Sequence, residues 1–285
     1  MKRIIYILFL FMLFSCRKEV KLKLPTYKQK IVVEASIETG SYAIVFLSYS
    51  VPYFGDFDYS APGKTFIKGA HVTVTDGITI DTLTELDPNS GYAYLGFKLK
   101  GQQGKTYTLK VTVDNKTYET STTILNPAKL DSLYFKGEED TLGYIWQTFS
   151  EPIGSGDCYR WFAKRLGRDQ FYSAPFNSAF DDKFIDGKKF DFAYDRGPQP
   201  NEIQNYKDDP ERGYYKRGDT VIVKFCKIGR REYDFWNTYY QNKASNGNPF
   251  SAPANIKSMF ENNQDVFGAF VGYAPFFDTI IIPKN

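Results

Sequence analysis

The sequence predicts an all-β protein with two β-sandwich-like domains, the second of which carries one amphipathic helix. Aromatic residues make up 18% of the chain, and aromatic and β-branched residues favour strands. Short runs of alternating apolar and polar residues are separated by Asp-Gly and Asp-Asn pairs, which are turn signals. Only residues 229–243 place their large apolar side chains at helical spacing.

The N-terminus predicts export from the cytoplasm. Lys2 and Arg3 precede an apolar run from Ile4 to Phe14, which is followed by Ser15 and Cys16. A basic, an apolar and a small-residue region in this order define a secretory signal. The apolar run is too short for a transmembrane helix, which needs roughly 20 apolar residues.

The residues around the expected cleavage site resemble the lipobox of bacterial lipoproteins, in the form Leu13-Phe14-Ser15-Cys16. This resemblance implies diacylglycerol on the Cys16 sulfur and cleavage after Ser15. Several acyl chains on one residue anchor a protein firmly, because each buried methylene adds ~0.8 kcal/mol. Residue 17 is Arg rather than Asp, so the best-known inner-membrane retention signal is missing. We therefore expect the outer membrane, with the periplasmic or cell-surface side left open.

The charge balance excludes one class of partner. The chain has 36 basic and 33 acidic residues, and removal of Lys2 and Arg3 with the leader leaves 34 basic residues. A mature chain so close to neutral has no electrostatic basis for binding nucleic acid.

The first domain is predicted as a series of short strands joined by hairpins. Residues 30–37 and 42–48 are apolar and β-rich, and Asp76-Gly77 separates two alternating runs. Asp114-Asn115 joins residues 107–113 to residues 116–122 in a second hairpin with one buried and one wet face. Strands at this spacing predict a β-sandwich.

Three segments of this domain together resemble the transthyretin-like and carboxypeptidase-regulatory-like sandwiches. They are Lys68–Val74, Ser90–Tyr94 and Gly104–Leu109, which follow the forms G-A-x-V-x-V, G-x-Y and G-x-x-Y-x-L. The resemblance implies an immunoglobulin- or transthyretin-like fold and carries no activity with it.

The second domain is predicted to begin after Asn126-Pro127, because Pro ends a strand and the pattern restarts beyond it. Asp186-Gly187 predicts a hairpin between residues 184–185 and 188–190, and residues 246–274 are rich in Asn, Gly and Pro and predicted to be irregular. The expected divisions are a signal peptide at 1–15, a lipidated tether at 16–28, a sandwich at 29–126 and a second β-rich domain at 127–285. The expected strands of this second β-rich domain are residues 130–135, 144–149, 159–164 and 220–225.

The order of motifs resembles an uncharacterised lipoprotein family of Bacteroidota. The lipobox, the Gly-Ala-x-Val sandwich, Tyr144-Ile145-Trp146, the Asp-Gly-Lys turn and the helix are followed by Asn248–Ser251 and Phe267–Tyr273. Members of that family carry a domain of unknown function and are often encoded beside TonB-dependent outer-membrane receptors. The resemblance therefore implies such a transporter as a partner.

Residues capable of chemistry are scarce. His71 is the only histidine, so a two-His zinc site is excluded. It lies mid-strand, where a structural role is favoured over that of a base, and no Gly-x-Ser-x-Gly elbow is present. Besides Cys16, two cysteines remain, Cys158 and Cys226, and either a disulfide or two buried free thiols fits the sequence.

Two acidic groups suggest alternatives to a purely structural role. Asp56 and Asp58 lie in an aromatic loop, and Asp181, Asp182 and Asp186 precede the second Asp-Gly turn. Paired carboxylates are what a glycosidase needs. Residues 181–191 could also supply oxygen ligands to calcium, although their spacing matches no EF-hand loop. Solvated turn residues explain both groups more simply, since Asp is a preferred turn former.

Aromatic loops are the strongest candidates for function. Rings crowd two predicted loops, the first with Tyr53, Phe54, Phe57 and Tyr59 and the second with Phe171, Tyr172, Phe176 and Phe180. Exposed rings stack on sugars or dock on proteins, whereas buried rings fill a core. The strand aromatics Trp146 and Trp161 are predicted to be core, and the first loop is predicted to be a docking surface.

The sequence thus predicts a non-catalytic outer-membrane lipoprotein without a cofactor. Its expected role is that of a binding or accessory subunit, held to the membrane by lipid and associated with an outer-membrane receptor or transporter. The alternative is a surface carbohydrate-binding or glycosidase-like protein that uses the loop aromatics and the Asp56/Asp58 pair.

Overall fold

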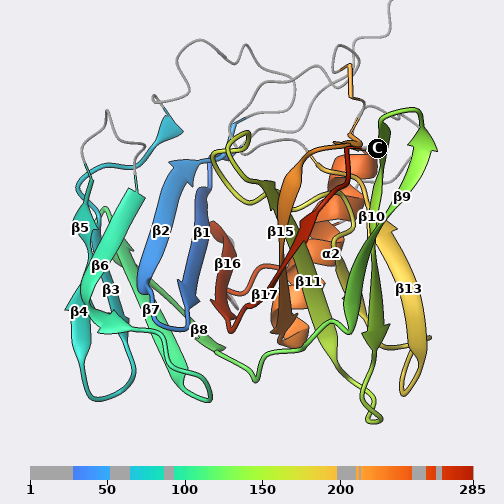
Figure 1. The fold of residues 1–285 in the computed structure, drawn as a ribbon. Coiled ribbons are helices and arrows are strands. Elements are labelled where there is room, and N and C mark those ends of the chain that lie inside the picture. The colour runs from blue at the N-terminus through green and yellow to red at the C-terminus, as the bar shows by residue number, and fades with distance from the viewer. Residues whose placement is uncertain are drawn as a thin grey trace, which may run out of the picture.

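The computed structural model describes residues 28–51, 65–86, 93–197, 210–211, 213–245, 255–260 and 265–284. These residues form four β-sheets and one α-helix. The sheets pack in pairs as two sandwiches that lie side by side, the first on the left and the second on the right of Figure 1. The predicted all-β class, with two sandwiches and one helix in the second, is confirmed.

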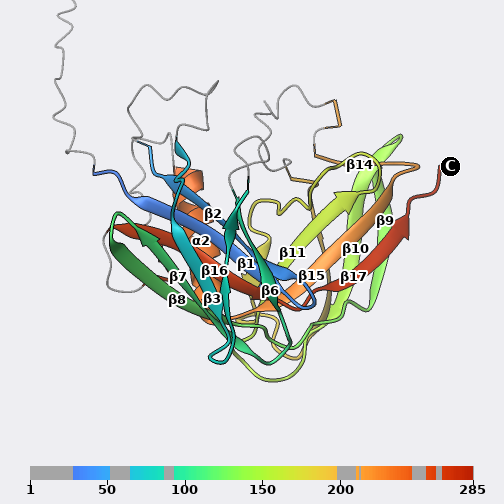
Figure 2. The same ribbon diagram turned by 90° about the vertical axis from the view of Figure 1, so that its left-hand side faces the viewer.

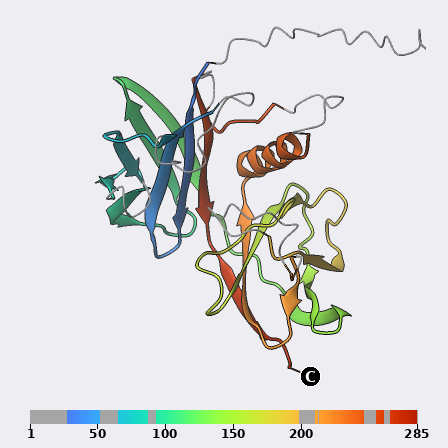
Figure 3. The same cartoon turned by 90° about the horizontal axis from the view of Figure 1, so that it is seen from above.

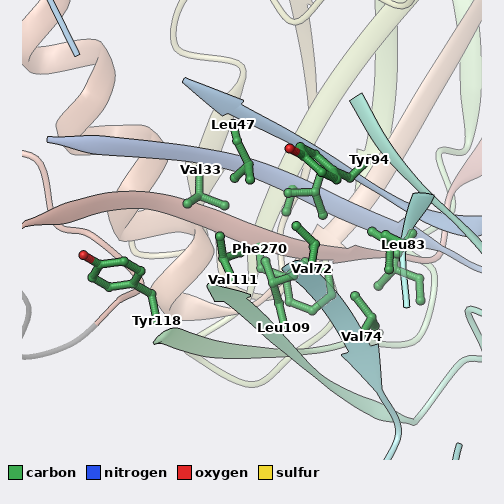
Figure 4. Packing of buried hydrophobic residues seen from close by; sticks show 14 of the residues in the cluster. Val33, Leu47, Val72, Val74, Leu83, Tyr94, Leu109, Val111, Tyr118 and Phe270 are labelled. Atoms are coloured by element: carbon green, nitrogen blue, oxygen red, sulfur yellow. The ribbon is translucent and has the colours of Figure 1, made fainter. Parts of the chain in front are cut away.

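The first sandwich packs a five-stranded sheet (sheet 1) against a four-stranded one (sheet 2). Val33 and Leu47 of sheet 1 face Val72 and Leu109 of sheet 2 across a hydrophobic core (Figure 4). Sheet 1 has the order β16 (Val266–Tyr273), β1 (Ile31–Glu38), β2 (Tyr42–Tyr49), β6 (Ala93–Lys100) and β5 (Thr84–Glu85). Sheet 2 has the order β4 (Ile80–Thr82), β3 (His71–Thr75), β7 (Thr106–Val113) and β8 (Lys116–Thr123).

The turn chemistry explains the two hairpins of sheet 2. Asp114 and Asn115 have φ of 49° and 61°, and two positive φ values are what a tight I′-type hairpin requires. This confirms the predicted β7–β8 hairpin. The other turn is longer than predicted, because the Asp76 carboxylate accepts the backbone N–H groups of Ile78 and Thr79 at 3.1 and 2.8 Å. Strand β4 therefore starts only at Ile80.

The C-terminal strand β16 returns to the first sandwich. It pairs in parallel with β1 from Ile31–Val266 to Glu38–Tyr273, and Figure 2 shows it running beside β1. The prediction that residues 246–274 are irregular is wrong for this strand, and the predicted second unit, 127–285, supplies an edge of the first. The cause is that β16 pairs with β1, which lies more than 200 residues earlier, so no turn motif close to β16 indicates this pairing. The continuous apolar run of β16 is nevertheless typical of a strand buried on both faces.

The second sandwich also packs two sheets, around an aromatic core. Phe149 meets Tyr159 edge to face at 5.0 Å between ring centroids, and Phe225 stacks on Tyr159 at 5.4 Å. Sheet 3 has the order β13 (Lys189–Tyr194), β10 (Leu142–Ser150), β14 (Tyr215–Lys216), with β9 (Ser132–Glu139) also paired to β10. Sheet 4 has the order β12 (Ala179–Asp181), β11 (Cys158–Arg165), β15 (Thr220–Ile228) and β17 (Phe276–Ile281).

The predicted hairpin at Asp186-Gly187 is wrong. Phe184 and Ile185 lie in a turn, and the flanking strands β12 and β13 belong to opposite sheets. The Glu151 carboxylate accepts the Gly187 N–H at 2.7 Å and so fixes this crossover. The Asp-Gly pair therefore lies in a connection between two sheets, where a tertiary hydrogen bond fixes it, rather than in a hairpin.

The helix α2 (Arg230–Ser245) confirms the helix predicted at 229–243. It lies in the angle between β16 and the second sandwich (Figure 3). Its Phe235, Trp236 and Tyr240 are buried against sheet 4 and β16. Sheet 4 is therefore covered on one face by sheet 3 and over part of the other by α2 and β16.

Candidate functional site

The residues first predicted to carry function lie outside the described residues. These are the lipidation site, the loop of the predicted docking surface and the paired carboxylates of the alternative, namely Cys16, Tyr53, Phe54, Phe57, Tyr59, Asp56 and Asp58. They stay predictions.

The second aromatic loop divides between core and surface. Phe180 packs in the core of the second sandwich, 5.4 Å from the Tyr159 ring centroid. Tyr172 is half-buried, whereas Phe171 and Phe176 are 47% and 44% exposed. This loop is held to the edge of β11 by two backbone hydrogen bonds between Ala163 and Ser173, of 3.0 and 2.8 Å.

This anchoring brings Tyr172 against the face of sheet 4 on which α2 packs. The register of sheet 4 sets Phe162, Lys224 and Phe277 side by side on one face. The Tyr172 ring lies 5.9 Å from that of Phe277. We call the set Lys164, Phe171, Tyr172, Lys224 and Phe277 the Tyr172 patch.

The Tyr172 patch combines the exposed rings of Phe171 and Phe277 with the half-buried Lys164 and the buried Lys224. The ammonium groups of Lys164 and Lys224 lie 5.9 and 5.7 Å from the centre of the Tyr172 ring, within the range of a cation–π attraction. Lys224 also pairs with Glu38 of β1, which ties the patch to the first sandwich. Phe277 is 48% exposed. Exposed apolar rings beside a surface charge, here that of Lys164, are typical of a surface that binds a partner.

A second aromatic face lies on the outside of sheet 3. Tyr134 stacks on Trp146 at 6.3 Å, and Lys136 lies 5.2 Å from the Trp146 ring. The prediction that Trp146 is core is wrong, because its strand turns this side chain to the outer face, where it is half-buried. Trp161, from the facing strand, is fully buried and donates to Gln147 at 3.0 Å, so its prediction is confirmed.

The second acidic group is explained by turn and ion-pair contacts. Asp182 accepts the N–H groups of Gly156 and Asp157 at 2.6 and 2.7 Å, and Asp186 accepts that of Gly154 at 2.8 Å. Asp181 pairs with Arg230 at 2.9 Å. Within the described ranges, no His, Cys, Asp and Glu side chains are grouped so as to hold a metal ion.

The two cysteines are buried free thiols. They lie on adjacent strands of sheet 4, with Cys158 opposite Ile228 and Cys226 opposite Arg160. This is a diagonal pair, for which Cα atoms are roughly 7–8 Å apart, farther than a disulfide spans. Burial raises the pKa of each thiol to about 12, so neither is an activated nucleophile at neutral pH. His71 lies exposed on β3, in the other sandwich.

A buried cation lies where α2, sheet 4 and β16 meet. The Arg160 guanidinium stacks 3.4 Å from the centre of the Trp236 ring and 4.7 Å from that of Phe162. Its Nη1 donates to the Tyr273 hydroxyl at 2.6 Å. Burial raises the pKa of Tyr273, so this acceptor is a neutral phenol at physiological pH. We call Arg160, Trp236 and Tyr273 the Arg160 cluster.

The energetics of this cation are close to balanced. Taking an ion out of water costs several kcal/mol. A desolvated cation–π contact contributes about 2 kcal/mol and a charged hydrogen bond about 1.5–3 kcal/mol. Arg160 is therefore no clear source of stability. Sequence reasoning missed both Arg160 and Lys224, although a cation inside an otherwise apolar strand run was a visible signal in each case.

Comparisons with known proteins complete this description. No curated protein matches the chain. Among solved structures, a two-fibronectin type-III domain segment from chicken tenascin matches with 11% sequence identity over 89% of this chain and 99% of its own. Its TM-score is 0.24, too low to indicate a shared fold. Within the described residues, no helix has the length and apolar character needed to cross a bilayer. A family model matches residues 17–276, and the chain therefore belongs to the family described as Domain of unknown function (DUF4249).

Proposed function

We propose that this protein is a non-catalytic outer-membrane lipoprotein of a member of the Bacteroidota and that it binds a partner protein through exposed aromatic side chains. The observation that carries the proposal is the Tyr172 patch, where the exposed rings of Phe171 and Phe277 lie near the Lys164 ammonium. The partner we propose is a TonB-dependent transporter, which is the one that the family resemblance of the sequence implies.

Two features support a binding rather than a catalytic role. The buried carboxylates of Glu151 and Asp182 accept backbone N–H groups at turns, and such acceptors are already committed to the fold. Both described thiols have a raised pKa and are buried. Large rings at a surface, by contrast, carry a disproportionate share of interface energy because they bury area while losing little rotamer freedom.

Membrane attachment through Cys16 is the first testable part of the proposal. The family match begins at residue 17, so residues 1–16 lie outside the shared domain, as a leader and its lipidated cysteine would. We expect mass spectrometry of the mature protein to find an acylated Cys16 at the N-terminus. Cys16→Ser is expected to abolish acylation and to move the protein out of the outer-membrane fraction. A mature chain that begins elsewhere and carries no lipid would refute this part.

The Tyr172 patch is tested by removing its two most exposed rings. Phe171→Ala combined with Phe277→Ala is expected to weaken binding to the proposed TonB-dependent transporter by about tenfold or more, because truncation of a central aromatic anchor costs over 1 kcal/mol. Binding is measured by titration of the purified transporter in detergent. The melting temperature is expected to change little, since both rings are about half exposed.

The matched control removes two other exposed phenylalanines, Phe97 in β6 and Phe184 in the crossover turn, which are 54% and 76% exposed. This double alanine variant is expected to bind like the wild type. Equal binding by the patch variant and the wild type would place the docking surface elsewhere. The loop with Tyr53, Phe54 and Phe57 would then be tested by replacing these three residues together with Ala in the same binding assay.

Carbohydrate binding is the second candidate function, and the outer face of sheet 3 favours it. There the parallel Tyr134 and Trp146 rings lie beside the Asp191 carboxylate, which accepts from the Tyr134 hydroxyl at 3.2 Å. Stacked rings next to a hydrogen-bonding carboxylate suit the apolar face and hydroxyl groups of a sugar. The test is retention of the protein on an outer-membrane polysaccharide. Carbohydrate binding would be favoured over protein docking if Trp146→Ala abolishes retention while the Phe171→Ala/Phe277→Ala variant is still retained.

A further inference from the structure

Two buried N–H groups in the Arg160 cluster have no hydrogen-bond partner within the described part of the chain. They are the Nε of Arg160 and the indole Nε1 of Trp236. The two side chains are stacked on one another, and Arg160 is only 6% exposed. Buried donors are nearly always satisfied in folded proteins, so two unsatisfied donors on a pair of stacked side chains require an explanation.

The charge around Arg160 is unbalanced as well. Its one hydrogen bond goes to the neutral Tyr273 hydroxyl. Glu34 of β1 acts on Arg160 through space without a hydrogen bond, and the nearby carboxylate of Glu38 is paired with Lys224. Within the described residues, the guanidinium thus has no carboxylate as a hydrogen-bond acceptor, and its Nε donates to none of them.

Another buried arginine shows what a structural role looks like in this protein. Arg165, also on β11, donates from Nε and Nη2 to Asp169 at 3.0 and 2.6 Å and from Nη1 to Glu211 at 2.7 Å. Its guanidinium is therefore bound by carboxylates on both edges. Arg160 lies five residues earlier on the same strand and lacks what Arg165 has, which is an acidic acceptor.

We propose that the Arg160 cluster is a binding site for the carboxylate or phosphate group of a small molecule. An oxyanion taken side-on accepts from Nε and Nη2 in two parallel hydrogen bonds, which is the arrangement that makes arginine selective for planar anions. The Nη1 hydrogen bond to Tyr273 is kept, and the Trp236 N–H supplies a further donor.

The surroundings define the rest of the ligand. Trp236 stacks with Phe235 and Tyr239 along α2, at 5.0 and 5.8 Å between ring centroids. These rings favour an apolar or aromatic body attached to the anionic group. Because Arg160 is buried in the seam of helix and sheets, the ligand is a small molecule rather than the surface of another protein. This proposal does not require the docking role of the Tyr172 patch, although Lys224 of that patch lies 5.0 Å from the centre of the Tyr273 ring.

The test uses the full chain in detergent with sodium benzoate and sodium phosphate, each titrated against sodium chloride at equal ionic strength. Binding is followed by calorimetry and by the indole N–H resonances of the three tryptophans. We expect saturable binding of at least one anion together with a shift of one indole resonance, which Trp236→Phe removes. Tighter binding of benzoate identifies a carboxylate ligand, and tighter binding of phosphate identifies a phosphate ligand.

Three variants assign the binding to this site. Arg160→Lys keeps the charge but loses the planar fork, so we expect affinity to fall about tenfold or more. Glu34→Gln removes a repelling carboxylate, so affinity is expected to rise several-fold. Arg230→Lys, which alters an exposed ion pair on the same helix, is the control and should bind like the wild type.

The proposal is overturned if neither anion binds the wild type or shifts the Trp236 resonance. It is also overturned if Arg160→Lys binds as tightly as the wild type. A third contrary result is that Glu34→Gln lowers the melting temperature and leaves affinity unchanged, since Glu34 would then be the resident partner of Arg160. If Arg160→Lys does not fold, the proposal is tested by two other results. These are the anion-induced shift of the Trp236 indole resonance and the change in anion affinity of Glu34→Gln.

Discussion

A chain that consists of residues 29–126 alone is expected to remain unfolded. This segment contains every strand of the first sandwich except β16, and β16 covers the whole length of β1 through eight paired residues. Phe260, Val266, Phe270 and Ala274 also belong to the core of this sandwich. Each large side chain contributes about 1.5–3 kcal/mol by burial, so their loss removes much of a stability of about 5–15 kcal/mol.

Circular dichroism and amide resonance dispersion measure this outcome directly. The control joins residues 255–275 to the same segment through a long Gly/Ser linker, which restores β16 without the second sandwich. We expect the joined chain to unfold cooperatively. If residues 29–126 alone give dispersed resonances and a cooperative transition, the first sandwich is autonomous and β16 is dispensable.

Gly268→Ala is expected to destabilise the whole protein by about 3 kcal/mol or more, because a built Cβ cannot fit at this position. It would lie 1.9 Å from the carbonyl oxygen of Val33 on the parallel strand β1. That atom is backbone in the middle of a sheet, so relief requires β1 and β16 to separate. The melting temperature is expected to fall by on the order of 10 °C.

Gly137 provides the matched control. It also lies in a strand, β9, but the nearest atoms to a Cβ built on it are 3.9 Å away. Gly137→Ala is expected to change the free energy of unfolding by less than about 0.5 kcal/mol. Similar melting temperatures for the two variants would show that the contact between β1 and β16 yields more easily than its geometry indicates.

Local signals predicted the elements whose partners are near in the sequence. The β7–β8 hairpin follows from alternation on both sides of Asp114-Asn115, two residues that adopt positive φ at low cost. The helix α2 follows from apolar spacing around Trp236. In both cases the residues that determine the conformation lie within about ten positions of one another, so a single sequence contains the needed information.

Local signals failed where a distant contact decides the conformation. The same Asp-Gly pattern lies in a hairpin turn at Gly77 but in a crossover between two sheets at Gly187. The difference arises because the Glu151 carboxylate accepts the Gly187 N–H. Trp146 and Trp161 lie in similar strand runs, yet only Trp161 faces the core. Which face of a strand is buried depends on what packs against it, and the strand's own alternation leaves that choice open.

The sequence by itself determined the all-β class, the helix and the hairpin turns with short-range partners, because these depend on backbone propensity and periodicity along one stretch of chain. Only the tertiary structure decided that β16 completes the first sandwich, that Tyr172 lies near two lysines and that Arg160 is buried with no acidic acceptor among the described residues. Each of these depends on residues far apart in the chain, and their meeting is set by how the sheets and α2 pack. Both candidate sites, the Tyr172 patch and the Arg160 cluster, lie where such distant residues come into contact.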